Sequence, residues 1–368
     1  MYKKRCLLQR FFLLLFYMKH SLIVGLGLAG MAYAEQLRRA GLSFHIIDGG
    51  VGGSSQIAAG IYNPTVLKRF SLSWNGELFH SYALPFYAQL QARLDSEFIH
   101  PAPIYKIFNK LSEHNDWVSA SDQQGLKIFM DPKIHTNIPN KVKSPLGYGQ
   151  VNFTGRVATQ ILLKSFRDSL QPEELTTENF EYDQLETTAE RIQYKQIKAK
   201  HIVFCEGYQM VNNPFFNKLP LIGLKGEILI IKAPSLKSKS ILKGPIFIAP
   251  IGGDLYWAGA TFERNDKTLA CTEQGRSWIE EHIRNMISSE YAVLEHIAQI
   301  RPTVLDRRPL IGSHPDHQNI HLLNGFGARG VLGAPLLSKW LFDHIEGISE
   351  LPAAVNLSRF ESYFRQTD

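Results

Sequence analysis

"SLIVGLGLAGMAYAEQLRRAGLSFHIID", residues 21–48, carries the clearest structural pattern in the chain. It opens with an apolar run, residues 22–24, that ends at Gly25, a pattern typical of a buried parallel strand. Good helix formers follow, with apolar residues at helical spacing and Gly41 where a helix C-cap belongs. "SFHIID" then predicts a second strand, which ends at Asp48. The stretch therefore predicts a β–α–β unit at the start of a parallel sheet.

Three glycines between the first strand and the helix indicate what this unit binds. Gly25, Gly27 and Gly30 spell GxGxxG. In such a unit the first glycine permits a tight turn, the second lets the backbone approach a pyrophosphate, and the third lets helix and strand pack closely. The helix N-terminus offers N–H groups to phosphates, and Asp48 is placed to accept hydrogen bonds from ribose hydroxyls. The unit predicts a dinucleotide site that disfavours NADP, because a carboxylate repels a 2′-phosphate, and it leaves NAD and FAD open.

Length, charge and cysteine content set broader bounds. A chain of 368 residues exceeds what one hydrophobic core usually serves, so we expect two domains. The net charge of +6 is spread thinly along the chain, and no Lys/Arg block resembles a nucleic-acid arm. The basic residues either lie on solvated loops or attract an anionic substrate or an RNA. Cys6, Cys205 and Cys271 lie far apart without a CxxC. We therefore expect no disulfide framework, no metal site and a cytoplasmic location.

Residues 1–17 form a basic and apolar head that contains "FFLLLFYM". The apolar run is too short to span a bilayer, and no small-residue cleavage site follows it. A strand pattern begins at His20, so cleavage at the usual distance would cut into that strand. Because "MKHSLIVGLG" at Met18 is typical of a cytosolic enzyme start, we expect residues 1–17 to be an upstream extension. A membrane-associating tail and a secretory signal are the alternatives, and no stable membrane span is expected.

Further blocks indicate more places where backbone approaches a flat ligand. Residues 49–70, "GGVGGSSQIAAGIYNPTVLKRF", are rich in small residues, with a flexible loop as the alternative interpretation. Residues 200–207 predict another apolar strand that ends at Gly207. Late in the chain, "NIHLLNGFG" predicts a strand that enters a glycine turn, and "APLLSKWLFDHI" predicts a helix. This late strand–loop–helix suggests a return to the first sheet, with a second helix N-terminus directed at the ligand.

Three blocks together resemble the FAD-dependent D-amino-acid oxidase superfamily, in particular its glycine oxidase and sarcosine oxidase branch. The blocks are "VGLGLAG…IID", "SSQIAAGIYNP" and "IRPTVLDRRPLIG…GFGARGVLGAP". The last block is also similar to the FAD oxidase domain of the bifunctional enzymes that finish the wobble-uridine modification 5-methylaminomethyl-2-thiouridine in tRNA. The resemblance spans roughly residues 18–345, although the matching motifs cover about a quarter of that span. It changes the expected ligand from a dinucleotide in general to FAD.

The resemblance implies a discontinuous two-domain architecture: an α/β FAD-binding Rossmann-like domain of three layers, and an α+β substrate domain with an antiparallel sheet. After the extension at 1–17, the FAD domain would comprise residues 18–71, 151–220 and 301–347. The substrate domain would comprise residues 72–150 and 221–300. The strand-like runs "KGEILIIKA", "GPIFIAPIGG" and "DLYWAGATFE" support this division independently, since they predict a meander rather than a βαβ pattern.

The resemblance also implies which residues contact FAD. The expected cofactor-binding residues are Gly25, Gly27, Gly30, Asp48, Ser54, Ser55, Gly60, Ile61, Gly207, Gly325, Gly327 and Gly330. Covalent flavin attachment in relatives uses a Cys near the C-terminal block or a His near the second glycine segment. Residues 301–347 contain no Cys and residues 49–64 contain no His, so we expect non-covalent FAD.

In this family the cofactor performs the redox step, by accepting a hydride from the substrate's α-carbon at flavin N5. The imine product then hydrolyses, and oxygen or another electron acceptor reoxidises the flavin. Arg301, in "QIRPTVLDRRP", inherits by position the role of binding the substrate carboxylate, which a guanidinium pairs with two hydrogen bonds. An ion pair with Asp306, or a surface position, is the alternative. Arg329, in "GFGARGVLG", is the second candidate for a catalytic residue.

Several other residues carry weaker expectations. Asn63 would contact the ring or the substrate, or else form a plain Asn-Pro turn. Tyr256, Trp257 and Phe262 lie where a wall of the substrate pocket is expected, with ordinary packing as the alternative for each. The histidines of "HPDHQNIH", 314–321, lack a fourth ligand at standard spacing, and we expect an exposed polar loop rather than a metal site.

The expected function is therefore FAD-dependent oxidation of a C–N bond in a small amine or amino acid with a carboxylate, as in glycine, sarcosine and D-amino-acid oxidases. The alternative is processing of the carboxymethylaminomethyl group of a wobble uridine, with tRNA as the partner. That group contains a glycine unit, so Arg301 would serve in both cases. A non-catalytic flavin-binding protein is a third hypothesis.

Overall fold

The computed structural model describes residues 18–50, 52–137 and 141–365, so the expectations for the head, residues 1–17, and Cys6 lie outside the described residues. The predicted β–α–β unit is present: β1 (Met18–Val24), α2 (Leu28–Arg39) and β2 (Phe44–Ile47). β1 begins two residues before the predicted His20, because Met18 and Lys19 pair in parallel register with β14 (Ile197–Phe204). Val24 lies beside both Ile47 and Phe204, so the carboxyl ends of three parallel strands are level.

Short strands complete this first sheet. β11 (Leu175–Thr176) pairs in parallel with β2, and β21 (His317–Asn324) pairs in parallel with the last residues of β14. Three further strands join antiparallel at the edges: β12 (Leu185–Thr187), β13 (Ile192–Tyr194) and β20 (Leu310–His314). The late return of the chain to the first sheet, predicted from "NIHLLNGFG", is therefore present as β21. The sheet is mixed, with its parallel strands at the centre.

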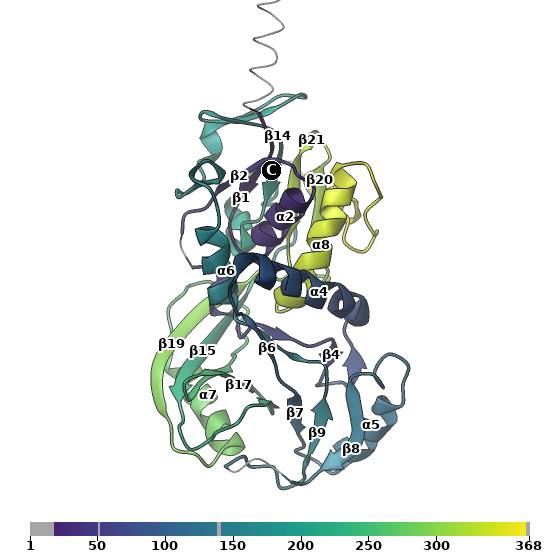
Figure 1. Cartoon of the computed structure of the whole chain (residues 1–368), viewed down its shortest axis with the longest axis vertical. Helices are drawn as coiled ribbons and strands as arrows, with labels where there is room; N and C mark the ends of the chain where they lie inside the picture. Colours follow the sequence, from purple (N-terminus) through teal and green to yellow (C-terminus); the bar gives the residue numbers. More distant parts are fainter. Residues whose placement is uncertain (1–17, 51, 138–140, 366–368) are drawn as a thin grey trace, which may run out of the picture.

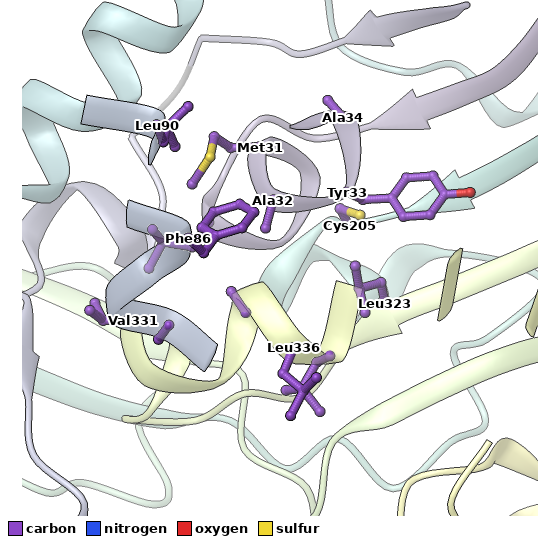
Figure 2. Close-up of a cluster of buried hydrophobic side chains, with 14 of the residues drawn as sticks. Met31, Ala32, Tyr33, Ala34, Phe86, Leu90, Cys205, Leu323, Val331 and Leu336 are labelled. Atoms are coloured by element: carbon purple, nitrogen blue, oxygen red, sulfur yellow. The ribbon is translucent and has the colours of Figure 1, made fainter. Parts of the chain in front are cut away.

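Helices from distant parts of the chain pack together beside the parallel strands (Figure 1). They are α2, α4 (Gly76–Leu94), α6 (Thr159–Asp168) and α8 (Gly330–Ile345). Met31, Phe86 and Leu336, from α2, α4 and α8, belong to one buried cluster that Figure 2 shows in close-up. Each such side chain stabilises the fold by roughly 1.5–3 kcal/mol. The buried Tyr87 hydroxyl also donates a hydrogen bond of 2.7 Å to the Val331 carbonyl oxygen, which ties α4 to the first turn of α8.

The other half of the molecule in Figure 1 is built on a second sheet of eight strands. In spatial order they are β19 (Ala292–Arg301), β15 (Leu224–Lys232), β18 (Leu255–Gly259), β17 (Phe247–Gly252), β16 (Ile241–Lys243), β7 (Ile104–Ile107), β9 (Tyr148–Val151) and β8 (Met130–His135). All neighbours are antiparallel except β16 and β7. α7 (Glu273–Met286) packs on the cluster that includes β15, and α5 (Ser112–Ser121) buries Trp117 in another.

The predicted meander is wrong in its order. β18 lies between β15 and β17 instead of following β17 outward. The reason is the connection after β15, which carries β16 across to β7, so that the chain re-enters the sheet further out and returns through the β17–β18 hairpin. That hairpin turns at Gly252, Gly253 and Asp254, all in left-handed backbone conformations.

Small elements connect the two sheets. A three-stranded sheet contains β3 (Ile61–Tyr62), β10 (Gly155–Val157) and β6 (Ile99–Pro101), and β4 (Thr65–Val66) pairs with β5 (Ser71–Leu72). Two short helices are α3 (Ser54–Ile57) and α9 (Glu361–Phe364).

Across the described residues, no helix combines the length and the apolar character needed to cross a bilayer.

Gly30 holds α2 close to β1, and its replacement tests this packing. A Cβ added at Gly30 would collide with the Gly25 carbonyl oxygen, a backbone atom that cannot rotate away. We expect Gly30→Ala to lower the free energy of unfolding by about 2–3 kcal/mol, measured by urea denaturation. Gly53→Ala is the matched control, because no atom lies within 4 Å of its added Cβ. Equal stability of the two variants would contradict the close approach.

Candidate active site

A cavity of about 1030 Å³ extends from the carboxyl ends of β1 and β2 to the second sheet. Segments 24–29, 52–61, 205–209, 299–302 and 326–332 supply most of its wall. The cavity is thus lined by the GxGxxG turn, by the small-residue block and by the late glycine loop. Sequence blocks that lie far apart along the chain meet at one place.

The GxGxxG turn forms one end of the cavity. Gly25 has φ +98°, and a Cβ there would lie 2.7 Å from the Cys205 carbonyl oxygen. Gly27 is the N-cap of α2 and provides no side-chain cap, while the Leu28 N–H donates to Ser55 Oγ at 3.2 Å. Gly27 thus adds no side chain of its own at the α2 N-terminus, where the Ser55 hydroxyl takes the place that a pyrophosphate oxygen would occupy. Gly30 packs against Gly25 instead of lining the wall.

Asp48 lies on the cavity wall at the end of β2, but its oxygens already have partners. Oδ1 accepts a 2.8 Å hydrogen bond from the Leu26 N–H. Oδ2 accepts from the Gly50 N–H at 3.1 Å and from the Arg167 guanidinium, with which Asp48 forms an ion pair. The expected contact with a ribose hydroxyl remains a prediction, and it requires Arg167 to share or release this carboxylate. Sequence reasoning missed Arg167, which comes from α6, far from the fingerprint.

Glu206 is a titratable group in this wall that the sequence did not single out. Its carboxyl accepts hydrogen bonds from the Tyr182 hydroxyl at 2.5 Å and from Asn213 Nδ2 at 2.7 Å. Burial raises the pKa of Glu206 to about 7, because the charged form loses hydration. This end of the cavity therefore carries a carboxyl group that changes charge near neutral pH.

Arg301 defines the opposite end of the cavity. It ends β19, and its guanidinium lies against Gly226 of β15, 4.8 Å from the centre of the Phe262 ring. Its Nη1 donates a 3.4 Å hydrogen bond to the Thr261 carbonyl oxygen. Burial lowers the pKa of Arg301 to about 10. The predicted alternative, an ion pair with Asp306, is wrong, because Asp306 pairs with Arg359.

Within the described parts of the chain, neither Arg301 nor Arg329 forms an ion pair with a carboxylate. Arg329 is the N-cap of α8 and borders the cavity, where its Nη1 donates to the Asn63 carbonyl oxygen at 3.3 Å. The Arg329 side chain is exposed, and partial desolvation by the surrounding chain lowers its pKa. Two guanidinium groups thus border the cavity without counter-charges, an arrangement that attracts an anionic ligand.

The remaining predicted residues divide into two groups. Those on the cavity wall are Ser54, Ser55, Gly60, Ile61, Asn63, Gly207, Trp257, Phe262, Gly327 and Gly330. Gly325 lies off the wall, where a Cβ would meet a Val304 methyl group at 2.6 Å. Tyr256 is buried elsewhere, with its hydroxyl near the Ser238 backbone. Adjacent side chains of a strand point to opposite faces, so Trp257 lies on the wall and Tyr256 does not.

Two side-chain contacts join the sheets at the cavity. Trp257 Nε1 donates to the Ile57 carbonyl oxygen at 2.9 Å, and Gln299 Nε2 donates to the Gly52 carbonyl oxygen at 2.8 Å. Sequence reasoning missed Gln299, although its position two residues before Arg301 places it on the same face of β19. The small-residue block is therefore fastened to the second sheet.

Of the histidines in 314–321, which were expected to form an exposed polar loop, His321 is buried in β21 and bonded to Ser313 and His201. His314 and His317 lie at the β20–β21 turn. The expectation of an exposed polar loop is thus wrong for His321, because β21 places it at the centre of the sheet.

The GxGxxG turn and the cavity beside it are typical of a dinucleotide-binding fold, and the comparisons with known proteins specify the class. Residues 20–344 match the family described as FAD dependent oxidoreductase, DAO, and the chain belongs to this family. The expected superfamily is thereby confirmed, and the protein is an FAD-dependent oxidoreductase.

Solved structures of the family share the fold. Glycine oxidase from Geobacillus kaustophilus superposes with a TM-score of 0.77 at 18% identity, covering 94% of this chain and 98% of that one. Iminodiacetate oxidase from Chelativorans sp. BNC1 gives a TM-score of 0.73 at 18% identity, covering 93% and 98%. At these identities the similarity shows the fold alone.

Curated relatives carry the name tRNA 5-methylaminomethyl-2-thiouridine biosynthesis bifunctional protein. The protein from Marinobacter nauticus is 21% identical over 91% of this chain and 56% of its own length. The protein from Pseudoalteromonas translucida is 24% identical over 39% of this chain and 26% of its own length. The chain thus spans between about a quarter and just over half of these relatives.

Glu206 should make the stability depend on pH. Its folded pKa lies above the unfolded value, so its contribution is fully present below about pH 4.5 and is lost as the pH rises through 7. Histidines with lowered pKa values, such as His201, act in the opposite direction, so we expect the effect in the difference: from about pH 5 to pH 8 the wild type should lose about 2–3 kcal/mol of unfolding free energy relative to Glu206→Gln. Urea unfolding at each pH measures this. Exposed Glu186→Gln is the control, and a pH profile shared by all three proteins would contradict the assignment.

Proposed function

We propose that the protein oxidises the C–N bond of a small amine or amino acid that carries a carboxylate. The observation that carries this proposal is Arg301, a desolvated guanidinium on the cavity wall without an acidic partner among the described residues. Desolvated charge is unfavourable unless it is paired, so a carboxylate on the substrate would supply what the chain lacks. Glycine, sarcosine and D-amino acids are the simplest substrates with this chemistry.

We also propose the division of the molecule into two domains. The first sheet and its helices would bind FAD, and the second sheet would supply the substrate pocket. Support comes from the chain segments involved: the strands of the first sheet lie at 18–47, 175–204 and 310–324, and those of the second at 104–151, 224–259 and 292–301. The cavity lies between them.

The residues of the cavity fit FAD bound non-covalently. The turn at Gly25 and Gly27 would hold the pyrophosphate, and Gly60, Gly327 and Gly330 would bring backbone close to the ring. A Cβ at Gly60 would collide with the Val157 carbonyl oxygen, so the small-residue block is held against its neighbour by backbone packing alone. When bound, FAD supplies a hydride acceptor at flavin N5.

The chain's own residues would orient the substrate and exclude water. Arg301 would hold the carboxylate through two parallel hydrogen bonds, and Phe262 and Trp257 would cover the pocket. The carboxyl groups on the wall are Asp48, Glu178 and Glu206. Asp48 and Glu206 belong to the GxGxxG end, so the substrate amine would lose its proton to water rather than to a carboxylate beside Arg301.

A second candidate function is processing of a carboxymethylaminomethyl group on a wobble uridine of tRNA. It is supported by the curated relatives, one of which matches 91% of this chain. The group to be removed contains a glycine unit, so the same Arg301 contact would apply. Mass spectrometry of tRNA nucleosides from a gene deletion tests it, and an unchanged wobble modification would eliminate it.

Anaerobic flavin reduction tests the main proposal. We expect glycine, sarcosine, D-alanine or D-proline to bleach the absorbance of the flavin near 450 nm, with flavin released on acid precipitation. Arg301→Gln should lower kcat/KM by about a hundredfold or more, since a charge-assisted pair is lost. Arg307→Gln, on the exposed turn nearby, is the matched control. If none of these amines reduces the flavin, the proposal is wrong.

Gly226 offers a subtler test of Arg301. A Cβ at position 226 would lie 2.5 Å from Arg301 Cζ, but a guanidinium at the end of a flexible chain can move aside. We expect Gly226→Ala to fold and to retain flavin, while KM for the carboxylate substrate rises at least about tenfold. Gly244→Ala is the control, because its added Cβ would also meet only a flexible side chain, that of Met286, and it lies off the cavity wall. Unchanged KM in Gly226→Ala would show that the guanidinium position is unimportant.

A further inference from the structure

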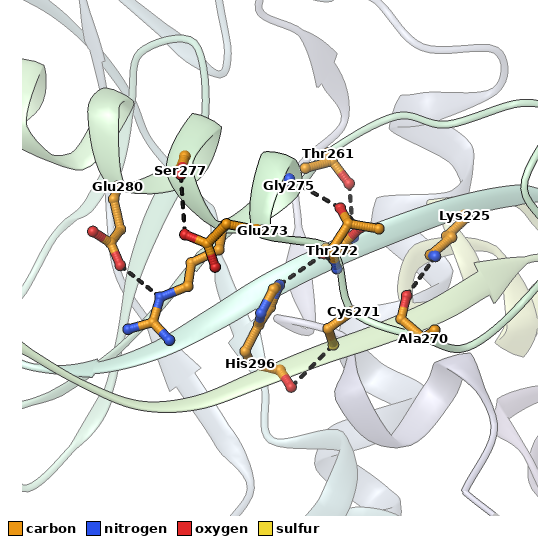
Figure 3. Close-up of polar contacts among 12 residues, drawn as sticks. Lys225, Thr261, Ala270, Cys271, Thr272, Glu273, Gly275, Ser277, Glu280 and His296 are labelled. Carbon is orange, nitrogen blue, oxygen red and sulfur yellow. Dashed lines mark hydrogen bonds and ion pairs between the residues drawn. The ribbon is translucent and has the colours of Figure 1, made fainter.

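Three potential metal ligands lie together outside the cavity. They are Glu227 on β15, Cys271 just before α7, and His296 on β19. One ligand atom from each, a carboxylate oxygen, the thiol sulfur and an imidazole nitrogen, lie within 4.8 Å of one another. Figure 3 shows Cys271 and His296 beside the strands, with Thr272 close by. Among the described residues, no other group of three His, Cys, Asp or Glu side chains meets this condition.

Strand alternation separates this cluster from the substrate pocket. Gly226 and Ile228 of β15 line the cavity, so Glu227 between them points to the other face. On β19, Gln299 pairs with Gly226 and His296 pairs with Leu229, so His296 lies on the same face as Glu227; Ile300 of that face borders the cavity only where β19 ends. A group bound to this cluster would therefore not occupy the substrate site.

The three side chains are held in place by their neighbours. Glu227 is 4% exposed, and its Oε2 accepts from the Thr272 N–H at 2.9 Å and contacts His296 Nε2 at 2.8 Å. Its Oε1 accepts from the Thr272 hydroxyl at 2.8 Å. The Cys271 thiol donates to the His296 carbonyl oxygen at 3.2 Å. These contacts hold the three side chains close together, and Zn²⁺ would replace two of them: the Cys271 thiol would release its proton to solvent, and His296 Nε2 would exchange its hydrogen bond to Glu227 for the ion.

We propose that Glu227, Cys271 and His296 bind Zn²⁺, with water as the fourth ligand. Thiolate, imidazole and carboxylate are the ligand types that zinc takes in proteins, and three protein ligands leave a position for water. Cys271 is exposed, so solvent reaches that position. The two negative ligands balance the ion's charge, and nearby Lys225 is already paired with Asp266.

A Cys–His–Glu nucleophilic triad is the competing interpretation of the same residues. In such a triad the thiol hydrogen-bonds to the imidazole ring that activates it. Here the thiol donates to the backbone carbonyl of His296 instead. The ring nitrogen that is bonded in the structure faces Glu227. The geometry therefore favours a metal ligand over a nucleophile.

Zinc at this position would fasten one end of the loop formed by residues 260–271. Phe262, Lys267 and Leu269 of this loop line the cavity. The loop is already tied to β15 by backbone bonds between Lys225 and Glu263 and by the Lys225–Asp266 ion pair. Coordination through Cys271 would add an anchor where the loop enters α7. The metal would be structural, and this inference does not depend on which substrate the cavity takes.

Metal titration of the full-length protein, stripped by chelator, tests the proposal. We expect about one Zn²⁺ per chain, and with Co²⁺ a thiolate-to-metal absorption band. Cys271→Ser and His296→Gln should each weaken Zn²⁺ binding by about a hundredfold or more. Cys6→Ser and His282→Gln are the matched controls and should bind as the wild type does. Flavin absorbance and urea unfolding verify that each variant is folded.

Hydrogen exchange provides the second readout. Zn²⁺ should slow exchange in residues 260–271 of the wild type and of Cys6→Ser, but not of Cys271→Ser. The proposal is overturned if the stripped protein binds no Zn²⁺. It is equally overturned if Co²⁺ gives no thiolate band, or if Cys271→Ser binds Zn²⁺ as tightly as Cys6→Ser.

Discussion

The close approach of α2 to β1 at Gly25 and Gly30 sets the geometry of the first sheet, of its helices and of the cavity. It brings a helix N-terminus to the level where three parallel strands end. The same packing lets α2 meet α4 and α8 in one buried cluster, and α8 presents the second glycine loop. The cavity exists because backbone, rather than side chains, occupies these positions.

The second sheet contributes charge to a site that the first sheet shapes. β15 and β19 are neighbours, so Gly226 makes room for the guanidinium that ends β19. Trp257 and Gln299 fasten the small-residue block across the cavity. On the other face of the same two strands, Glu227 and His296 hold the start of α7. Alternation along two strands thus separates a ligand pocket from a candidate metal site.

The sequence predicted the parts of this structure that depend on local patterns. Strand, glycine turn, helix and terminal acid followed from residues 21–48, and the late strand and helix from their apolar spacing. The order of β17 and β18 was not predictable, because strand order depends on long-range pairing. The partners of Asp48 and the cluster around Glu227 were missed for the same reason. Arg167, Cys271 and His296 come from distant segments, and their proximity is a property of the fold.

We propose that Arg301 holds a substrate carboxylate beside the flavin. The most direct measurement is a titration of the oxidised protein with acetate, a carboxylate that cannot be oxidised here, against the uncharged acetamide. We expect a saturable change in the flavin spectrum with acetate, none with acetamide, and loss of the acetate response in Arg301→Gln. Equal responses to acetate and acetamide, or an acetate response that persists in Arg301→Gln, would contradict it.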